Sequence, residues 1–244
     1  MSDSKDMTLT EHIQELRQRL LRALIVWLVV TIGATFFVDY VLGWLVKPLG
    51  ENEVIVLSPT EAPIIYFKVA LMMGFMFALP YILYQVYTFV APGLLAGERA
   101  IFLAGVPAAL MLAVLGALFT LEVLIPLSLP ILMRFLGGVV QPTYSLEQYL
   151  SFVTTLVVWM GLLFQTPLVI YMIARLGFIE PAQLTKLRKV IIFLAAVAAA
   201  VITPTTDPVT MLLVTGPFVV LYEVGIMLAR VAIRQRKRAA ARAI

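Results

Sequence analysis

Long apolar runs dominate this chain of 244 residues. A helix that crosses a bilayer needs roughly 20 mostly apolar residues, and four segments meet that requirement: 20–46, 69–91, 100–125 and 149–174. Hydrophobic residues make up 62% of the chain and charged residues 13%, and the mean hydropathy is +1.01. A soluble domain of this size is far less apolar. The sequence therefore predicts an all-α integral membrane protein.

Two further apolar segments are shorter. The run at 190–203 has 14 residues and ends before Pro204. In the last membrane segment, 209–229, the apolar run has 13 residues and ends before Tyr222. Runs of about 10 to 14 residues are typical of re-entrant or buried segments, so these two form either a hairpin that dips into the membrane or two short spans. We favour two short spans, because flanking basic residues can snorkel and the bilayer can thin locally.

The basic residues predict the orientation. Fifteen of the 18 lysines and arginines lie on one side if the chain crosses six times with both termini on that side. The positive-inside rule makes that side the cytoplasm, although a re-entrant hairpin would leave the same ends inside. We therefore expect six transmembrane helices, both termini cytoplasmic, an amphipathic cytoplasmic helix over 8–19 and a basic cytoplasmic tail over 230–244.

The composition excludes several classes of function. The absence of cysteine excludes disulfides and thiolate metal sites. His12 is the only histidine, has no acidic neighbour at metal-ligand spacing, and is expected at the surface. Motifs of hydrolases, nucleotide-binding proteins and zinc enzymes are missing. We therefore expect no enzymatic activity, no cofactor and no metal. We also expect no nucleic-acid partner, because the basic residues lie at the ends of apolar runs and not in one exposed patch.

The N-terminal residues bear on localisation. They include acidic side chains and lack both the basic start and the cleavage site of a signal peptide, and they do not resemble an organelle transit peptide. We therefore expect a multi-pass protein of the inner (cytoplasmic) membrane of a bacterium or archaeon.

Two acidic residues stand among the cytoplasmic basic ones. Glu15 is four residues before Arg19, and such a pair on an exposed helix contributes about 0.3 to 0.5 kcal/mol. Glu98 opens the third span, where the helix macrodipole favours a carboxylate by roughly 0.3 to 1 kcal/mol. The alternative is that both carboxylates face the same compartment to meet a peptide with two guanidinium groups. The spacing alone leaves both alternatives open.

Two polar residues lie inside apolar spans, where they usually face the bundle interior or a cavity. Gln165 is expected either to make an interhelical hydrogen bond of about 0.6 kcal/mol or to act functionally. Glu122, near the outer end of its span, either snorkels to the interface or is buried for function. Four prolines are expected to kink or break their helices: Pro80, Pro107, Pro167 and Pro217.

Specific motifs are spread along nearly the whole chain. They are His12–Leu20 (HIQELRQRL), Pro48, Ser58–Glu61 (SPTE), Tyr84–Leu94 (YQVYTFVAPGL), Glu98-Arg99, Tyr149–Phe152 (YLSF), and Thr203-Pro204 with Asp207. With these motifs the chain resembles the TatC family, the polytopic receptor of the twin-arginine protein translocase. The resemblance implies a concave, glove-like bundle of six helices with both termini cytoplasmic and with short fifth and sixth helices.

The resemblance also implies functional residues. Glu15 and Glu98 would form the cytoplasmic site for the paired arginines of a signal peptide. Nearby residues of that site would be Arg17, Arg19, Phe89, Pro92 and Arg99, while Pro48 and Asp207 would matter on the outer side.

Partners are implied in the same way. Single-span TatA-like and TatB-like proteins would dock along the fifth span and near Gln165, in a larger complex in which the chain self-associates. Several relatives carry glutamate at the position of Gln165, so a hydrogen-bonding role survives there better than an ionisable one.

The expected function is a component of the Sec-independent translocase that binds twin-arginine signal peptides of folded cargo, with export driven by proton-motive force. One alternative is a secondary transporter or proton-coupled carrier, suggested by Glu122, Gln165 and the prolines. It predicts substrate flux from this chain alone. Another is a structural scaffold, which predicts no preference for arginine over lysine in a bound peptide.

Overall fold

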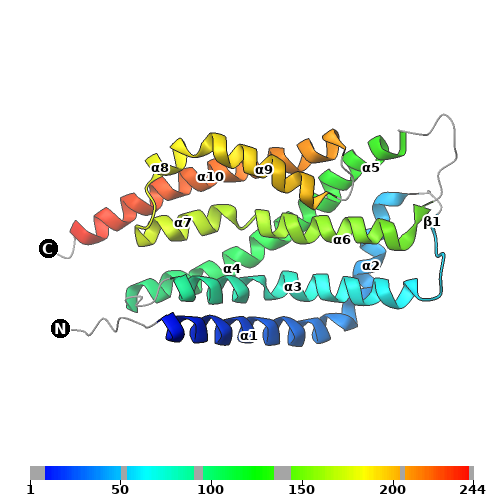
Figure 1. Ribbon diagram of the computed structural model, residues 1–244, viewed down its shortest axis with the longest axis horizontal. Helices are drawn as coiled ribbons and strands as arrows, with labels where there is room; N and C mark the ends of the chain where they lie inside the picture. Colours follow the sequence, from blue (N-terminus) through cyan, green and yellow to red (C-terminus); the bar gives the residue numbers. More distant parts are fainter. Residues whose placement is uncertain (1–8, 51–53, 91–95, 135–143, 204–206, 242–244) are drawn as a thin grey trace.

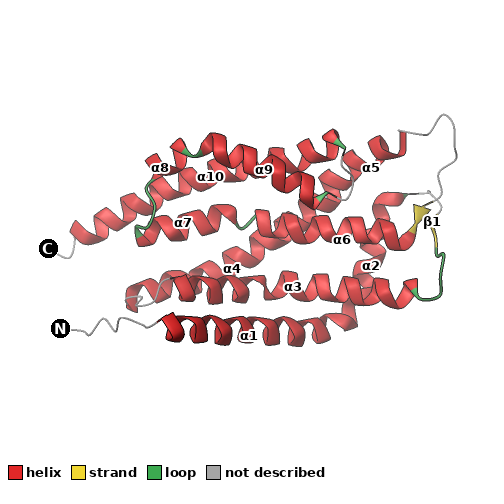
Figure 2. Ribbon diagram, in the orientation of Figure 1, coloured by secondary structure: helices red, strands yellow, loops and turns green. Residues whose placement is uncertain are grey.

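The computed structural model describes residues 9–50, 54–90, 96–134, 144–203 and 207–241, and these are almost entirely helical (Figures 1 and 2). The first layer pairs α1 (Leu9–Ala34) with α3 (Glu61–Val90). After α1 the chain turns through η1 (Thr35–Phe37) into α2 (Val38–Val46) and η2 (Lys47–Leu49). The expected amphipathic helix over 8–19 and the first span are therefore one continuous helix, because no glycine or proline separates them.

The third predicted span is longer than expected. Helix α4 (Ala96–Phe119) continues through a π-helical segment, η3 (Thr120–Leu124), into α5 (Ile125–Arg134). Figure 1 shows α4 running obliquely from the end of α3 past α6 towards α5. Helix α5 therefore covers the first part of the stretch that follows the predicted span at 100–125.

The fourth predicted span is divided. Helix α6 (Leu146–Leu163) ends just before Phe164, and α7 (Thr166–Leu176) begins after Gln165, with Pro167 as its second residue. Pro167 has no N–H to bond to the preceding turn, so the predicted break is confirmed. The other three predicted prolines stay inside uninterrupted helices. Helix α7 ends at Gly177, whose φ of 86° is the left-handed conformation that glycine adopts most easily.

The last two predicted spans differ from each other. Between them and α7 lies a short helix, α8 (Pro181–Lys186), which the sequence did not predict. Helix α9 (Arg188–Ile202) has 15 residues, about 22 Å at 1.5 Å per residue, and is short as expected. Helix α10 (Pro208–Ala241) has 34 residues, so the expected short sixth helix is wrong. The arginines and alanines of the predicted tail are good helix formers and extend it.

Among the described residues, five helical segments are long and apolar enough to cross a membrane: Thr10–Leu49, Glu61–Phe89, Gly105–Leu132, Leu146–Leu176 and Pro208–Arg236. Helix α9 is below that length. Two-residue strands β1 (Val54–Ile55) and β2 (Tyr144–Ser145) pair in parallel at the end of the bundle where α3 and α6 begin. Figure 1 shows the start of α1, the end of α3 and the end of α10 together at the opposite end.

The apolar side chains are buried in two clusters. The larger surrounds α3 and α6 and includes Leu79, Leu150, Leu156 and Met160, each fully buried. The smaller joins α7 and α8 to α10 through residues such as Ile226. Many other large apolar side chains are exposed on α1, α9 and α10, as expected of helices that face lipid.

Candidate functional site

The first candidate acid, Glu15, lies on α1 and forms the predicted pair with Arg19. The Arg19 Nε donates to Glu15 Oε1 at 2.8 Å, and Arg19 Nη2 contacts the same oxygen. The Glu15 side chain is 19% exposed. Its second oxygen, Oε2, is buried and has no hydrogen-bond partner among the described residues. The internal pair therefore uses one carboxylate oxygen and leaves the other able to accept a donor.

An aromatic contact joins this part of α1 to the end of α3. The rings of His12 and Phe89 stack with their centroids 4.4 Å apart and their planes at 19°. His12 is half-buried by this contact and keeps part of its surface exposed. It lies three residues before Glu15, on the same side of the helix. Phe89, a predicted site residue, is thereby held within one helical turn of the Glu15 position.

The structure describes the remaining predicted residues of this site to different extents. Arg17 is exposed on α1. Glu98 and Arg99 lie in the first turn of α4, and the structure describes their backbone but not their side chains. Pro92 lies outside the described residues. Figure 1 shows the starts of α1 and α4 and the end of α3 at the same end of the bundle, so the topology brings the two candidate acids to one end.

Gln165 lies at the break between α6 and α7 and is 2% exposed. Its Nε2 donates to the carbonyl oxygens of Ala109 at 3.1 Å and Gly161 at 3.2 Å. The predicted interhelical hydrogen bond is therefore confirmed. The Oε1 atom is buried without a partner among the described residues, which leaves one acceptor available in the bundle interior.

Three predicted residues lie elsewhere. Glu122 is exposed on η3 and does not face the interior. Pro48 is half-buried within η2. Asp207 begins α10, where its Oδ1 accepts from the backbone N–H of Thr210 at 2.7 Å. That bond is a helix N-cap, with Pro208 at the first helical position.

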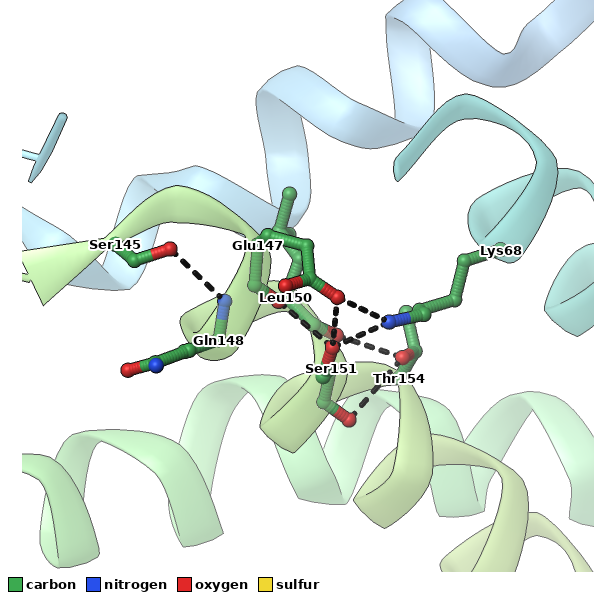
Figure 3. Close-up of polar contacts among 7 residues, drawn as sticks. All are labelled: Lys68, Ser145, Glu147, Gln148, Leu150, Ser151 and Thr154. Carbon is green, nitrogen blue, oxygen red and sulfur yellow. Dashed lines mark hydrogen bonds and ion pairs between the residues drawn. The ribbon is translucent and has the colours of Figure 1, made fainter. Parts of the chain in front are cut away.

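The sequence did not predict a polar cluster between α3 and α6 (Figure 3). Lys68 Nζ donates to Glu147 Oε1 at 3.0 Å and also bonds Ser151 Oγ. Ser151 Oγ in turn donates to the backbone oxygen of Glu147 at 2.7 Å. The side chains of Lys68 and Glu147 are each 33% exposed. The sequence offered one signal for this cluster, a lysine at the edge of an apolar run. It could not indicate Glu147 as the partner of Lys68, because the two residues are 79 positions apart.

A second unpredicted ion pair joins α9 to α10. Arg188 Nη2 contacts Glu223 Oε2 at 2.6 Å, and the neighbouring Tyr222 hydroxyl donates to the Leu184 carbonyl at 2.7 Å. In the described residues no three histidine, cysteine, aspartate or glutamate side chains gather into a metal-binding group. The polar contacts described above are therefore suited to holding helices and to binding cations such as guanidinium groups.

Comparisons with known proteins agree with this geometry. Residues 11–217 match the family model described as Sec-independent protein translocase protein (TatC). The TatC protein of Aquifex aeolicus is 39% identical over 237 residues, covering 95% of this chain and 98% of that protein. TatCd of Bacillus subtilis is 32% identical, covering 97% of each.

The fold agrees as well. The crystal structure of a twin-arginine translocase receptor TatC superposes with a TM-score of 0.78 at 38% identity, covering 91% of this chain and all of that one. The fold was expected from the sequence as a TatC-like helical membrane bundle, and this comparison confirms it. The chain belongs to the TatC family, and it is a multi-pass membrane component of the Sec-independent protein translocase and not an enzyme.

Proposed function

We propose that this chain binds the twin-arginine signal peptides of folded cargo proteins at the end of the bundle where α1 and α4 begin. The observation that carries the proposal is the Glu15 carboxylate, with one oxygen bonded to Arg19 and the other buried and without a partner in the part of the chain that the structure describes. A solved relative is described as a twin-arginine translocase receptor, which supports the same assignment.

The chemistry favours arginine as the ligand. A guanidinium group offers several N–H donors in a planar fork, whereas lysine offers a single ammonium group. A hydrogen bond between a charged donor and a carboxylate contributes on the order of 1.5 to 3 kcal/mol. The helical pair with Arg19 contributes about 0.3 to 0.5 kcal/mol when exposed. An incoming guanidinium that satisfies Glu15 Oε2 therefore gains more than a loosened internal pair loses.

Glu98 supplies the second carboxylate in the proposal. It lies in the first turn of α4, where backbone N–H groups hold a carboxylate in place electrostatically. Two carboxylates at one end of the bundle match two consecutive arginines. Phe89, stacked on His12, forms an apolar wall beside the first of them, and Arg17, Arg19, Pro92 and Arg99 complete the proposed site.

The test measures peptide binding to the purified protein in lipid nanodiscs. We expect Glu15→Ala and Glu98→Ala each to weaken binding of a twin-arginine peptide by about tenfold or more, since about 1.4 kcal/mol corresponds to a factor of ten. A twin-lysine peptide should bind the unaltered protein weakly. Glu11→Ala, one turn before Glu15, is the matched control. Equal binding of both peptides, or unchanged binding by both site variants, would contradict the proposal.

For assembly, we propose that single-span TatA-like and TatB-like partners dock on the outward face of α9. That face carries large exposed apolar side chains: Val190, Phe193, Val197 and Val201. Gln165 is enclosed by α4 and the α6–α7 break, so a partner reaches its buried Oε1 only if that break opens. Because the chain has no cysteine, a single cysteine at Phe193 can report partner crosslinking, with one at Leu212 on α10 as the control.

The protein is proposed to lie in the inner membrane of a bacterium or archaeon with both termini cytoplasmic, and to self-associate with its partners in a complex that exports folded cargo. Proton-motive force supplies the driving energy, about 2.3 kcal/mol per charge moved across 100 mV. Crosslinking from Phe193 that is no stronger than from Leu212 would contradict the proposed docking face.

A further inference from the structure

A groove on the side of the bundle lies between α1, α3 and α6. It encloses about 500 Å³. Helices α3 and α6 supply most of its lining, including Lys68, Phe75, Ser151, Thr155 and Trp159, and α1 contributes Trp27. All of these residues are described, and none belongs to the proposed signal-peptide site.

The groove is polar at one end and apolar at the other. Lys68 and Ser151 lie at the polar end, near the starts of α3 and α6. Phe75 and Trp159 lie seven and eight residues further along, which is about 10 to 12 Å deeper at 1.5 Å per residue. Figure 1 shows α3 and α6 running in the same direction, so the change in polarity follows the direction in which these helices cross the membrane.

The apolar end has no unsatisfied donor on α1. The Trp27 Nε1 donates to the Leu71 carbonyl at 3.1 Å, and its ring meets Phe75 edge to face with centroids 5.9 Å apart. The tryptophan therefore presents only its ring to the groove. A water molecule would find few hydrogen-bond partners at this apolar end, whereas a hydrocarbon chain would be stabilised by contact with the apolar side chains.

The polar end keeps hydrogen-bonding capacity of both kinds (Figure 3). A lysine ammonium has three N–H donors, and Lys68 uses two of them on Glu147 Oε1 and Ser151 Oγ. Among the described residues Glu147 takes these contacts on Oε1 alone, so Oε2 is left to accept. Both side chains are one-third exposed. The cluster therefore presents a cationic donor next to an anionic acceptor.

We propose that this groove binds one phospholipid with an amine-bearing headgroup, such as phosphatidylethanolamine. Lys68 donates to the lipid phosphate, Glu147 accepts from the headgroup ammonium, and one acyl chain lies along Phe75, Val158 and Trp159. The complementary charges and the polar-to-apolar gradient select a lipid over an apolar partner helix, which would leave the third N–H of Lys68 unsatisfied. With both termini cytoplasmic, as proposed above, the lipid belongs to the outer leaflet.

The test is native mass spectrometry of the purified protein titrated with single lipids in detergent. We expect phosphatidylethanolamine to bind about tenfold more tightly than phosphatidylcholine, because a quaternary ammonium cannot donate a hydrogen bond to Glu147. Phosphatidylglycerol, which has no amine, should bind as weakly as phosphatidylcholine. Equal binding of the three lipids would overturn the proposal.

Two variants test the location. Lys68→Gln removes the phosphate donor, and Thr155→Phe fills the groove without altering the Lys68–Glu147 pair, so it remains informative if Lys68→Gln folds poorly. Each should weaken phosphatidylethanolamine binding by about tenfold. Lys47→Gln, which removes an exposed lysine from η2 outside the groove, should leave it unchanged. Full binding by Thr155→Phe, an equal loss in Lys47→Gln, or crosslinking of a single-span partner to position 155 in place of lipid would overturn the proposal.

Discussion

Two carboxylates of this protein each pair with one base, and the two pairs differ in what they join. Glu15 bonds Arg19 one turn away on the same helix, whereas Glu147 bonds Lys68 across the contact between α3 and α6. Glu15 is the more buried of the two carboxylates, at 19% exposed against 33%. Burial therefore does not show which pair maintains the fold. Connectivity does, because only the second pair links two helices.

The difference has a functional consequence. A pair within one helix can open through side-chain rotation alone, so a ligand can replace it while α1 stays helical. A pair between helices cannot open without leaving a charge at a helix contact. The Glu15–Arg19 pair is thus suited to ligand exchange, and the Lys68–Glu147 pair is suited to fixing the distance between α3 and α6.

The largest effect on stability is expected at the pair between α3 and α6. Lys68→Met should lower the free energy of unfolding by about 2 kcal/mol, between the values typical of exposed and buried pairs, because Glu147 loses its base. Reversible unfolding in mixed micelles measures this. Lys47→Met is the control, since Lys47 is exposed on η2. A double variant, Lys68→Met with Glu147→Gln, should recover part of the loss, and no recovery would show that lysine packing matters more than charge.

The pair between α9 and α10 provides an intermediate case. Arg188 and Glu223 join different helices but are about 40% exposed. Arg188→Met should therefore lower the free energy of unfolding by about 1 kcal/mol, less than Lys68→Met. Lys189→Met, at the next position and exposed, is the matched control. If Arg188→Met cost more than Lys68→Met, exposure would not rank the two interhelical pairs.

The sequence predicted features that depend on local spacing. The Glu15–Arg19 pair follows from four-residue spacing on a helix, and the break before Pro167 follows from the missing N–H. The apolar runs located the membrane helices, because hydrophobic length is a local property. The boundaries were less accurate: α3 begins at Glu61 and α10 extends to Ala241, since helices continue beyond the hydrocarbon region wherever residues of good helix propensity follow.

Features that depend on tertiary packing could not be predicted. His12 meets Phe89 from 77 positions away, and Lys68 meets Glu147 from 79 positions away. No periodicity connects such residues, and their contact depends on how α1, α3 and α6 pack. The candidate site was therefore predicted through its local acids and the family resemblance, while its aromatic wall and the groove polar cluster needed the structure.

The smallest effect on stability is expected at the Glu15–Arg19 pair, and it is the most direct test of the comparison. A double-mutant cycle of Glu15→Gln and Arg19→Gln should give a coupling free energy of about 0.5 kcal/mol, as for other pairs within one helix. Glu15→Gln should nevertheless weaken twin-arginine peptide binding by about tenfold, because the carboxylate charge serves the ligand. A coupling near about 2 kcal/mol, as large as the loss of unfolding free energy expected for Lys68→Met, would mean that this pair also maintains the fold. The buried Glu15 oxygen would then be part of a structural contact, and an arriving guanidinium would have to disrupt the protein in order to bind.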